Sequence, residues 1–155
     1  FESRNRKISS ENVEKMYNLF KGHTYYIQKT FNEAFADTPE GDECSIKTLH
    51  TAINNLIAYN DTIFREILSN IPEKQKALLY AIAKDGEAER ITSAEFIKRH
   101  SLTSASSVQS ATNKLLEKDI ITEINKVYSV TDRLFGMWIN NLYGNSRNEL
   151  RSLKQ

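Results

Sequence analysis

Residues 72–143 carry an ordered series of patterns that only a few small folds share. The Asn125-Lys126 pair separates two β-patterned segments and has the length of a two-residue hairpin turn. A turn at 102–104 separates two segments of helical periodicity, as in a helix-turn-helix. The full order is helix, extended segment, helix, helix and two strands: 73–84, 88–91, 92–100, 105–118, 120–124 and 127–130.

A last helix is expected from Asp132 to about Tyr143. Apolar residues lie on most faces of this helix. Leu134, Trp138 and Leu142 fall on one stripe at four-residue spacing. We therefore expect this helix to be largely buried, with Trp138 in a core. A helix-turn-helix followed by a hairpin and a buried helix predicts a winged-helix domain over residues 72–143, with the hairpin as its wing. The polar residues 144–155 are expected to form a flexible tail.

Residues 1–71 are expected to form a separate helical bundle. The whole chain has only five glycines and two prolines, which favours a mainly α fold. Ser9 can cap the first helix, and Pro72 suits the start of a new one, so Pro72 is the expected boundary between the two domains. An acidic, turn-rich loop is expected at 37–43. The helices are expected at about 9–22, 24–35, 45–59 and 63–68.

Charge and composition exclude several classes of protein. The net charge is +1, and neither half is strongly basic: residues 1–71 hold 8 basic and 10 acidic side chains, and residues 72–143 hold 10 and 9. Strong non-specific binding to nucleic acid is therefore not expected. There is no run of 18 apolar residues, so no membrane partner is expected. Cys44 is the single cysteine and fits a reducing, cytoplasmic location.

No catalytic constellation is visible, so the chain is not expected to be an enzyme. The phosphate-loop pattern G-x-x-x-x-G-K-[ST] is absent, and no glycine is followed by lysine. His23, His50 and His100 lack the spacing of metal ligands, both with each other and with Cys44. We therefore expect no metal and no cofactor in this chain, and structural roles for the histidines.

The predicted helix 105–118 offers the strongest candidate binding surface. Small hydroxyls and amides on its outward face can donate to phosphates and read base edges, although an ordinary solvated face would look the same. Because few cations accompany these groups, any DNA binding should be weak. The predicted nucleic-acid-binding residues are Ser106, Ser107, Gln109, Ser110, Asn113 and Lys114 on the helix and Lys126 on the wing.

Several segments resemble the C-terminal region of archaeal-type P-loop ATPases, which are related to AAA+ proteins. Gly22-His23-Thr24-Tyr25-Tyr26-Ile27-Gln28 is similar to the Gly-His-Pro-Tyr-Tyr-x-Gln segment of their helical lid. Residues 71–83 resemble the first helix of their winged helix, and residues 104–121 resemble their recognition helix. The end of the match, 128–138, is also similar. The resemblance covers nearly the whole chain and makes residues 1–71 lid-like.

The resemblance implies a parent protein whose ATPase core precedes this chain, and the absence of an initiator methionine at Phe1 agrees with that expectation. That core would bind ATP and Mg²⁺, and it would be a partner of this chain. In related ATPases the lid turn lies against the nucleotide, which makes Gly22, His23 and Thr24 nucleotide-proximal. This sequence has Thr24 where the family has proline. A helix-terminating glycine beside an exposed histidine is the alternative interpretation.

Three functions remain open at this point. The first is a lid and winged helix that couple the nucleotide state of an ATPase to binding of double-stranded DNA or a partner. The second is a free-standing winged-helix regulator of transcription, which would usually be a dimer with a more basic surface. The third is a protein-docking module, which the near-neutral helix surface favours.

Overall fold

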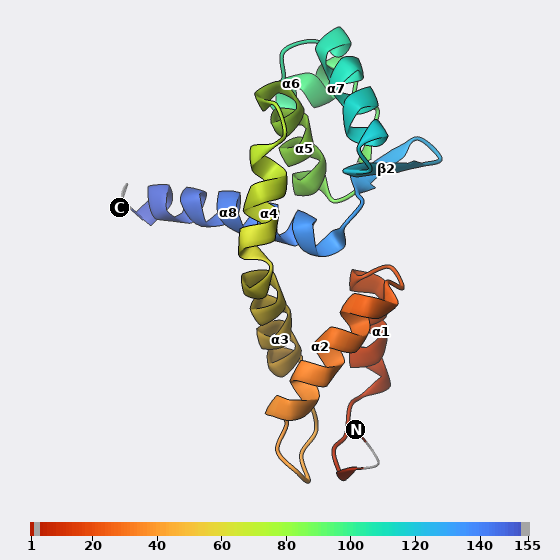
Figure 1. The fold of residues 1–155 in the computed structure, drawn as a ribbon, viewed down its shortest axis with the longest axis vertical. Coiled ribbons are helices and arrows are strands. Elements are labelled where there is room, and N and C mark those ends of the chain that lie inside the picture. The colour runs from red at the N-terminus through yellow and green to blue at the C-terminus, as the bar shows by residue number, and fades with distance from the viewer. Residues whose placement is uncertain (2–3, 153–155) are drawn as a thin grey trace. The chain divides into compact units, whose positions relative to one another are not determined.

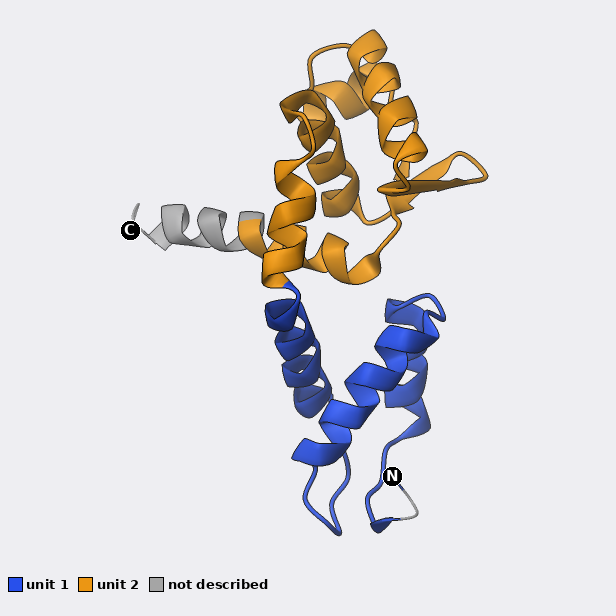
Figure 2. Cartoon of the chain, in the orientation of Figure 1, with its two compact units in different colours: residues 1–60 blue, residues 61–155 orange. Residues whose placement is uncertain are grey.

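The computed structural model describes residues 1 and 4–152, with side chains described as far as Leu142. Its described part contains eight helices and one three-stranded sheet, which confirms the predicted mainly α fold with a winged helix. The chain divides into two compact units, residues 1–60 and residues 61–155 (Figure 2).

Each unit has a simple order of elements (Figure 1). Unit 1 contains α1 (Ser10–Leu19), α2 (Thr24–Asp37) and α3 (Ile46–Tyr59). Unit 2 contains α4 (Asp61–Ser69), α5 (Glu73–Asp85), β1 (Ala88–Glu89), α6 (Ala94–Arg99), α7 (Ala105–Glu117), β2 (Ile121–Ile124), β3 (Val127–Val130) and α8 (Arg133–Ser152).

Two helices of unit 1, α1 and α3, begin where a serine hydroxyl caps them. The Ser9 side chain accepts a hydrogen bond from the Asn12 amide at the start of α1, and Ser45 does the same for α3. Helices α2 and α3 pack along each other, and α1 adds Met16 and Phe20 to the core. The periodicity of α1 predicts an inward stripe of Val13, Met16, Tyr17 and Phe20. This prediction is only half correct, because Val13 and Tyr17 are 40% and 60% exposed. Val13 and Tyr17 have the same helical periodicity as Met16 and Phe20, but the part of α1 that other residues cover is narrower than this stripe.

The loop that follows α2 is exposed but tied to the N-terminal segment. The Arg6 guanidinium donates to the Thr38 carbonyl oxygen at 2.6 Å, and its carbon lies 4.4 Å from the centre of the Phe35 ring. Lys7 and Glu43 form an isolated parallel bridge. The backbone therefore satisfies part of its hydrogen bonding at this loop even though its side chains are solvated.

Unit 2 is organised around α5. This helix packs against α7 and α8, and its buried side chains include Leu78, Leu79 and Ile82. The sheet order is β1-β3-β2 with both pairs antiparallel, so the β2–β3 hairpin is the wing and β1 extends its sheet. Leu115 from α7 and Leu134 from α8 are completely buried in the same unit.

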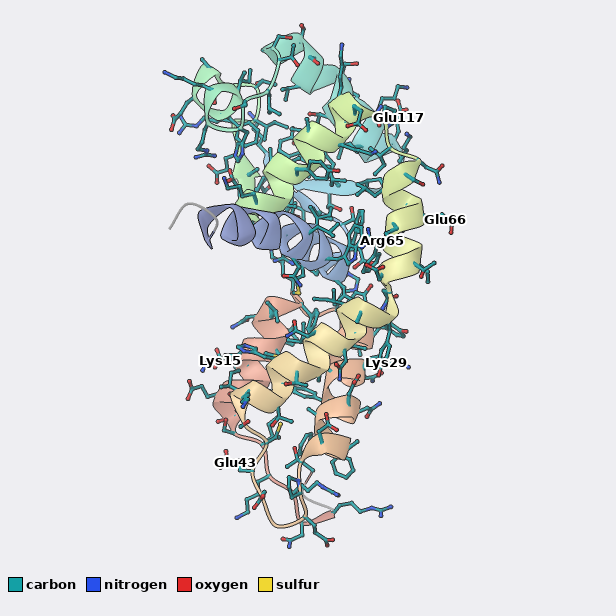
Figure 3. All side chains as sticks on the ribbon, turned by 90° about the vertical axis from the view of Figure 1, so that its left-hand side faces the viewer. Lys15, Lys29, Glu43, Arg65, Glu66 and Glu117 are labelled. Atoms are coloured by element: carbon teal, nitrogen blue, oxygen red, sulfur yellow. The ribbon has the colours of Figure 1, made fainter. Side chains whose placement is uncertain are left out.

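Helix α4 belongs to unit 2, and aromatic packing against α8 explains why. The Phe64 ring lies 5.2 Å from the Phe135 ring and 5.8 Å from the Trp138 ring, measured between centroids. Trp138 Nε1 donates to Asp61 Oδ1 at 2.8 Å, and Arg65 Nε donates to the other oxygen, Asp61 Oδ2, at 2.8 Å. Figure 3 shows Arg65 on the side of α4 that faces α8 and Glu66 on the opposite side.

The division between units therefore falls one helix earlier than the expected boundary at Pro72. Pro72 does precede α5 as its N-cap, but Ile71 is only 4% exposed, so the segment before Pro72 is not a solvated linker. Pro72 marks where α5 starts, but α5 starts inside unit 2 and not at the division between the units.

Two other helix ends differ from the sequence-based expectation. Thr92 followed three residues later by Glu95 predicts a capping box at the start of α6. In the structure Ser93 is the cap instead, with its hydroxyl accepting from the Phe96 amide, so this box does not form. Helix α8 runs on to Ser152 and not to about Tyr143, so residues 144–152 continue a helix where a flexible tail was expected. Residues 153–155 of the expected tail lie outside the described residues.

Limited proteolysis should cut first in the loop 39–43, because all five of its residues are exposed. A glutamate-specific protease should cleave after Glu40 or Glu43 before it cleaves after Glu73, which lies two residues after buried Ile71. Mass spectrometry of early digestion products provides the measurement. An initial cut within α7 would contradict the structure.

Candidate nucleic-acid interface

Helix α7 is placed by a tight turn after α6 and by its own buried stripe. Ser101 adopts a left-handed conformation, φ 54°, and the Leu102 amide donates to the Ile97 carbonyl oxygen at 2.9 Å. The Ser104 hydroxyl then accepts from the Ser107 amide and caps α7. The stripe that buries α7 consists of Val108, Ala111, Thr112 and Leu115, the same four residues that the periodicity predicts.

The opposite face of α7 carries the predicted polar residues. Ser106, Gln109, Ser110, Asn113 and Lys114 are exposed, whereas Ser107 is half-buried. Gln109 Nε2 donates to Asn113 Oδ1 at 3.2 Å, so these two amides lie on one line along the helix. The structure thus brings the helical members of the predicted set onto one outward face.

The positive charge on this face is smaller than the sequence suggests. Lys114 Nζ lies 3.0 Å from Glu117 Oε2, so the ammonium group is neutralised by its own helix. Lys118 Nζ donates to Gln75 Oε1 at 3.4 Å and keeps its charge without a carboxylate partner in the described part of the chain. Because an exposed ion pair is weak, Lys114 can exchange Glu117 for a phosphate at modest cost.

The wing places Lys126 at its tip. Asn125 and Lys126 both adopt left-handed conformations, φ 52° and 63°, which is the geometry that a two-residue hairpin turn requires. Both side chains are exposed. Behind the tip, Glu123 on β2 lies opposite Tyr128 on β3. Burial first, and then the neighbouring Glu123 carboxylate, raise the pKa of Tyr128.

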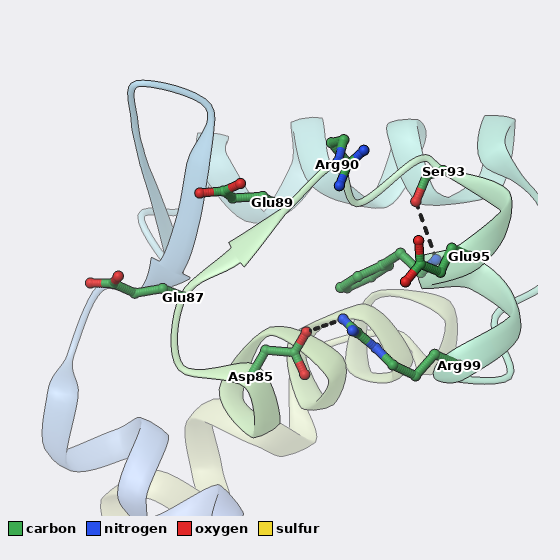
Figure 4. Close-up of a pocket in the computed structure, with 8 residues that line it drawn as sticks. Asp85, Glu87, Glu89, Arg90, Ser93, Glu95 and Arg99 are labelled. Atoms are coloured by element: carbon green, nitrogen blue, oxygen red, sulfur yellow. Dashed lines mark hydrogen bonds and ion pairs between the residues drawn. The ribbon is translucent and has the colours of Figure 1, made fainter.

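A second surface of unit 2 has the opposite charge and was missed by sequence reasoning. A pocket of about 430 Å³ lies between the end of α5, β1 and α6 (Figure 4). The lining includes the carboxylates of Asp85, Glu87, Glu89 and Glu95, together with Arg90 and Arg99. Arg99 pairs with Asp85, as Figure 4 shows, and the lining holds four carboxylates against two arginines. The alternation of acidic residues at 85, 87 and 89 was the available signal in the sequence.

The predicted nucleotide-proximal residues lie in unit 1, at the turn between α1 and α2. Gly22 has φ 75°, a conformation that other residues rarely adopt. It was predicted to end α1, but the C-cap is Phe20, and Lys21 between them is already left-handed at φ 48°. His23 is exposed and makes no capping bond through its side chain. Thr24 Oγ1 donates to the Gly22 carbonyl oxygen at 3.5 Å. A Cβ atom added at Gly22 would lie 3.1 Å from the Tyr17 hydroxyl oxygen, so the Tyr17 ring covers this glycine.

The described residues hold no cluster of three or more histidine, cysteine, aspartate or glutamate side chains that could bind a metal ion. Cys44 is buried, and His100 Nε2 lies 3.1 Å from Asp85 Oδ1 within the hydrophobic surroundings of Phe96. Across the described part of the chain, every helix is too short or too polar to span a membrane.

The family of the chain follows from its sequence as well as from this geometry. A family model described as "Probable winged helix domain" matches residues 62–141. Among curated proteins and among solved structures, no significant match to the chain was found. The matched segment begins inside α4 and ends inside α8, and it contains the whole helix-turn-helix and the wing. Because the match covers more than half of the 155 residues, the chain belongs to this family of winged-helix domains.

Proposed function

We propose that the winged helix of this chain binds double-stranded DNA weakly, with α7 in the major groove. The observation that carries the proposal is the exposed row of hydroxyl and amide groups on the second helix of a helix-turn-helix. In this motif the second helix enters the major groove with its N-terminal residues nearest the bases. Ser106, Gln109 and Ser110 are then the candidates for base contacts, with Asn113 further along the helix. Membership of a winged-helix family supports DNA as the partner.

The weakness of the binding follows from the charges. Lys126 at the wing tip and Lys114, once it leaves Glu117, can each neutralise one phosphate. Two or three such contacts give a slope of roughly −2 to −3 when the logarithm of the association constant is plotted against that of the salt concentration. A second linked binding site would be needed for appreciable occupancy at physiological salt.

The finer proposal is that this chain is the C-terminal region of a P-loop ATPase and couples its nucleotide state to DNA or partner binding. The lid-like motif at Gly22-His23-Thr24 supports it, because this turn is exposed and free to meet another domain. Tyr17 covers Gly22, so the turn alone is no nucleotide cradle, and ATP and Mg²⁺ would be held by the N-terminal ATPase core. The isolated chain should hydrolyse no ATP. The encoded sequence upstream of Phe1 tests this proposal, because it must contain a phosphate loop.

DNA binding should be measured by fluorescence anisotropy with a labelled duplex at low salt. We expect the wild type to bind, and we expect the double variant Lys114→Ala, Lys126→Ala to bind more weakly and with a salt slope reduced by roughly 1 to 2. The matched control is Lys47→Ala, Lys84→Ala, which removes two exposed lysines outside α7 and the wing. The control should bind as the wild type does.

Equal binding by the wild type and the Lys114, Lys126 double variant would remove this surface from the DNA hypothesis. A failure of the wild type to bind even at low salt would favour a protein-docking module instead. The acidic pocket of Asp85, Glu87, Glu89 and Glu95 favours that second candidate, because it suits a basic protein segment and repels phosphate. A free-standing transcription regulator would bind DNA as tightly in this isolated form as in any longer form.

A further inference from the structure

A polar groove separates the first turn of α5 from the first turn of α7. Its volume is about 620 Å³, and residues from both helices and from the turn before α7 line it. Ser106, Ser107 and Ser110 belong both to this groove and to the predicted face of α7. The groove therefore continues the surface that we assign to DNA toward the start of α5, where no contact was predicted.

The groove contains a lysine whose charge is available. Lys74 is exposed and forms no ion pair or hydrogen bond with any described residue. The neighbouring carboxylate of Glu73 lies 3.0 Å from Lys76 Nζ, which offsets its charge. Lys118, which contacts the groove residue Gln75, adds a second ammonium group at the edge. The available cations of this surface thus gather around the groove, whereas Lys114 is paired with Glu117.

The hydroxyl groups of the groove are also available as donors. Thr103 and Ser110 form no side-chain hydrogen bond with the described residues, and the Ser106 hydroxyl lies 3.2 Å from that of Ser104. Serine and threonine hydroxyls and lysine ammonium groups are among those that position a nucleic-acid backbone, because they donate to phosphate oxygens without reading sequence. The groove is open to solvent and lined by two helices, and it is not closed around a small anion.

We propose that this groove holds the sugar–phosphate backbone of one DNA strand, with Lys74 as its main cation, while α7 lies in the adjacent major groove. The inference rests on the proposed DNA-binding function and adds a contact made by α5.

The test compares Lys74→Ala with Lys84→Ala in duplex binding at 50 mM salt. The two lysines are exposed on opposite ends of α5, so the pair is matched in residue type, helix and charge. Loss of one phosphate contact should weaken binding by Lys74→Ala about tenfold and reduce the salt slope by roughly 0.9. Lys84→Ala should bind like the wild type, and Lys74→Arg should restore most of the affinity. Unchanged melting temperatures would show that the variants are folded.

Wild-type binding combined with normal binding by Lys74→Ala would overturn this inference and leave the proposed function intact. Absence of wild-type binding at low salt would overturn both. A second readout is the NMR shift of the backbone amides of Lys74 and Thr103 during titration with duplex, with inorganic phosphate at equal ionic strength as the comparison. Shifts that saturate with duplex support the inference. Equal saturation with inorganic phosphate would identify a site for small anions and would overturn it.

Discussion

Replacing Trp138 by alanine should lower the free energy of unfolding of unit 2 by about 3–5 kcal/mol, the usual cost of removing a buried tryptophan side chain. Trp138 is 3% exposed, and its ring packs with Phe64 and Phe135 between α4 and α8. The loss is a large share of the stability of a small domain. Trp138 is the single tryptophan, so the alanine variant has no tryptophan fluorescence, and its unfolding by denaturant should be followed by circular dichroism. A variant that unfolds at the wild-type midpoint would show that the aromatic cluster is not a core.

The substitution Trp138→Phe separates packing from hydrogen bonding in the same cluster. It keeps an aromatic ring but removes the Nε1 donor to Asp61, so its cost should be smaller than that of alanine. The hydrogen bonds from Arg65 first, and then from Trp138, lower the pKa of Asp61. A lowered folded-state pKa contributes stability above the ordinary pKa of aspartate, and this contribution is lost as the pH falls through the folded value. The difference between wild type and Trp138→Phe should therefore shrink in acid.

The second large effect is expected in unit 1, where Phe20→Ala should cost about 3–5 kcal/mol. Phe20 is completely buried, and its ring centroid lies 5.7 Å from that of Tyr26. The matched control is Tyr17→Ala, one turn earlier on the same helix, where the side chain is 60% exposed and the change should stay within about 0.5 kcal/mol.

Two probes assign the Phe20→Ala effect to its unit. Circular dichroism reports both units, whereas the fluorescence of Trp138 reports unit 2 alone. The variant should lose helical signal at lower denaturant while the fluorescence transition keeps its midpoint. If both probes shift together by the same amount, the two units unfold as one and the division into separate cores is wrong.

The winged helix was predictable from sequence because its information is local. β-favouring residues at 120–124 and 127–130, a two-residue turn and helical periodicity at 105–118 each act over a few neighbours, and the structure has these elements within one or two residues. The end of α8 is the exception, because this helix runs on to Ser152. The place of α4 was not predictable in this way. Its partner is α8, where Trp138 packs against Phe64 and donates a hydrogen bond to Asp61. Trp138 lies more than seventy residues after both, and 77 residues after Asp61. Only tertiary packing makes that contact visible.

The candidate interface likewise has a part that local sequence patterns predict and a part that depends on tertiary packing. Periodicity identified which side of α7 faces outward, so the exposure of Ser106, Gln109 and Ser110 could be predicted. The spacing of Lys114 and Glu117 already indicated that the glutamate opposes the lysine charge, but not that their charged groups lie 3.0 Å apart, because a lysine side chain can adopt other rotamers. Nor could it bring Lys74 beside Thr103, since the groove between them depends on how α5 packs against α7.

The packing of α4 on α8 also limits how this domain can move between proteins during evolution. A rearrangement that joined the helix-turn-helix and wing to a new neighbour at Pro72 would leave Phe135 and Trp138 without the cover of Phe64. An exposed aromatic face of that kind promotes aggregation. The segment that can be transferred as a stable domain therefore starts at Asp61. A recombination breakpoint between Asp61 and Pro72 would be selected against, even though it leaves the helix-turn-helix and the wing complete.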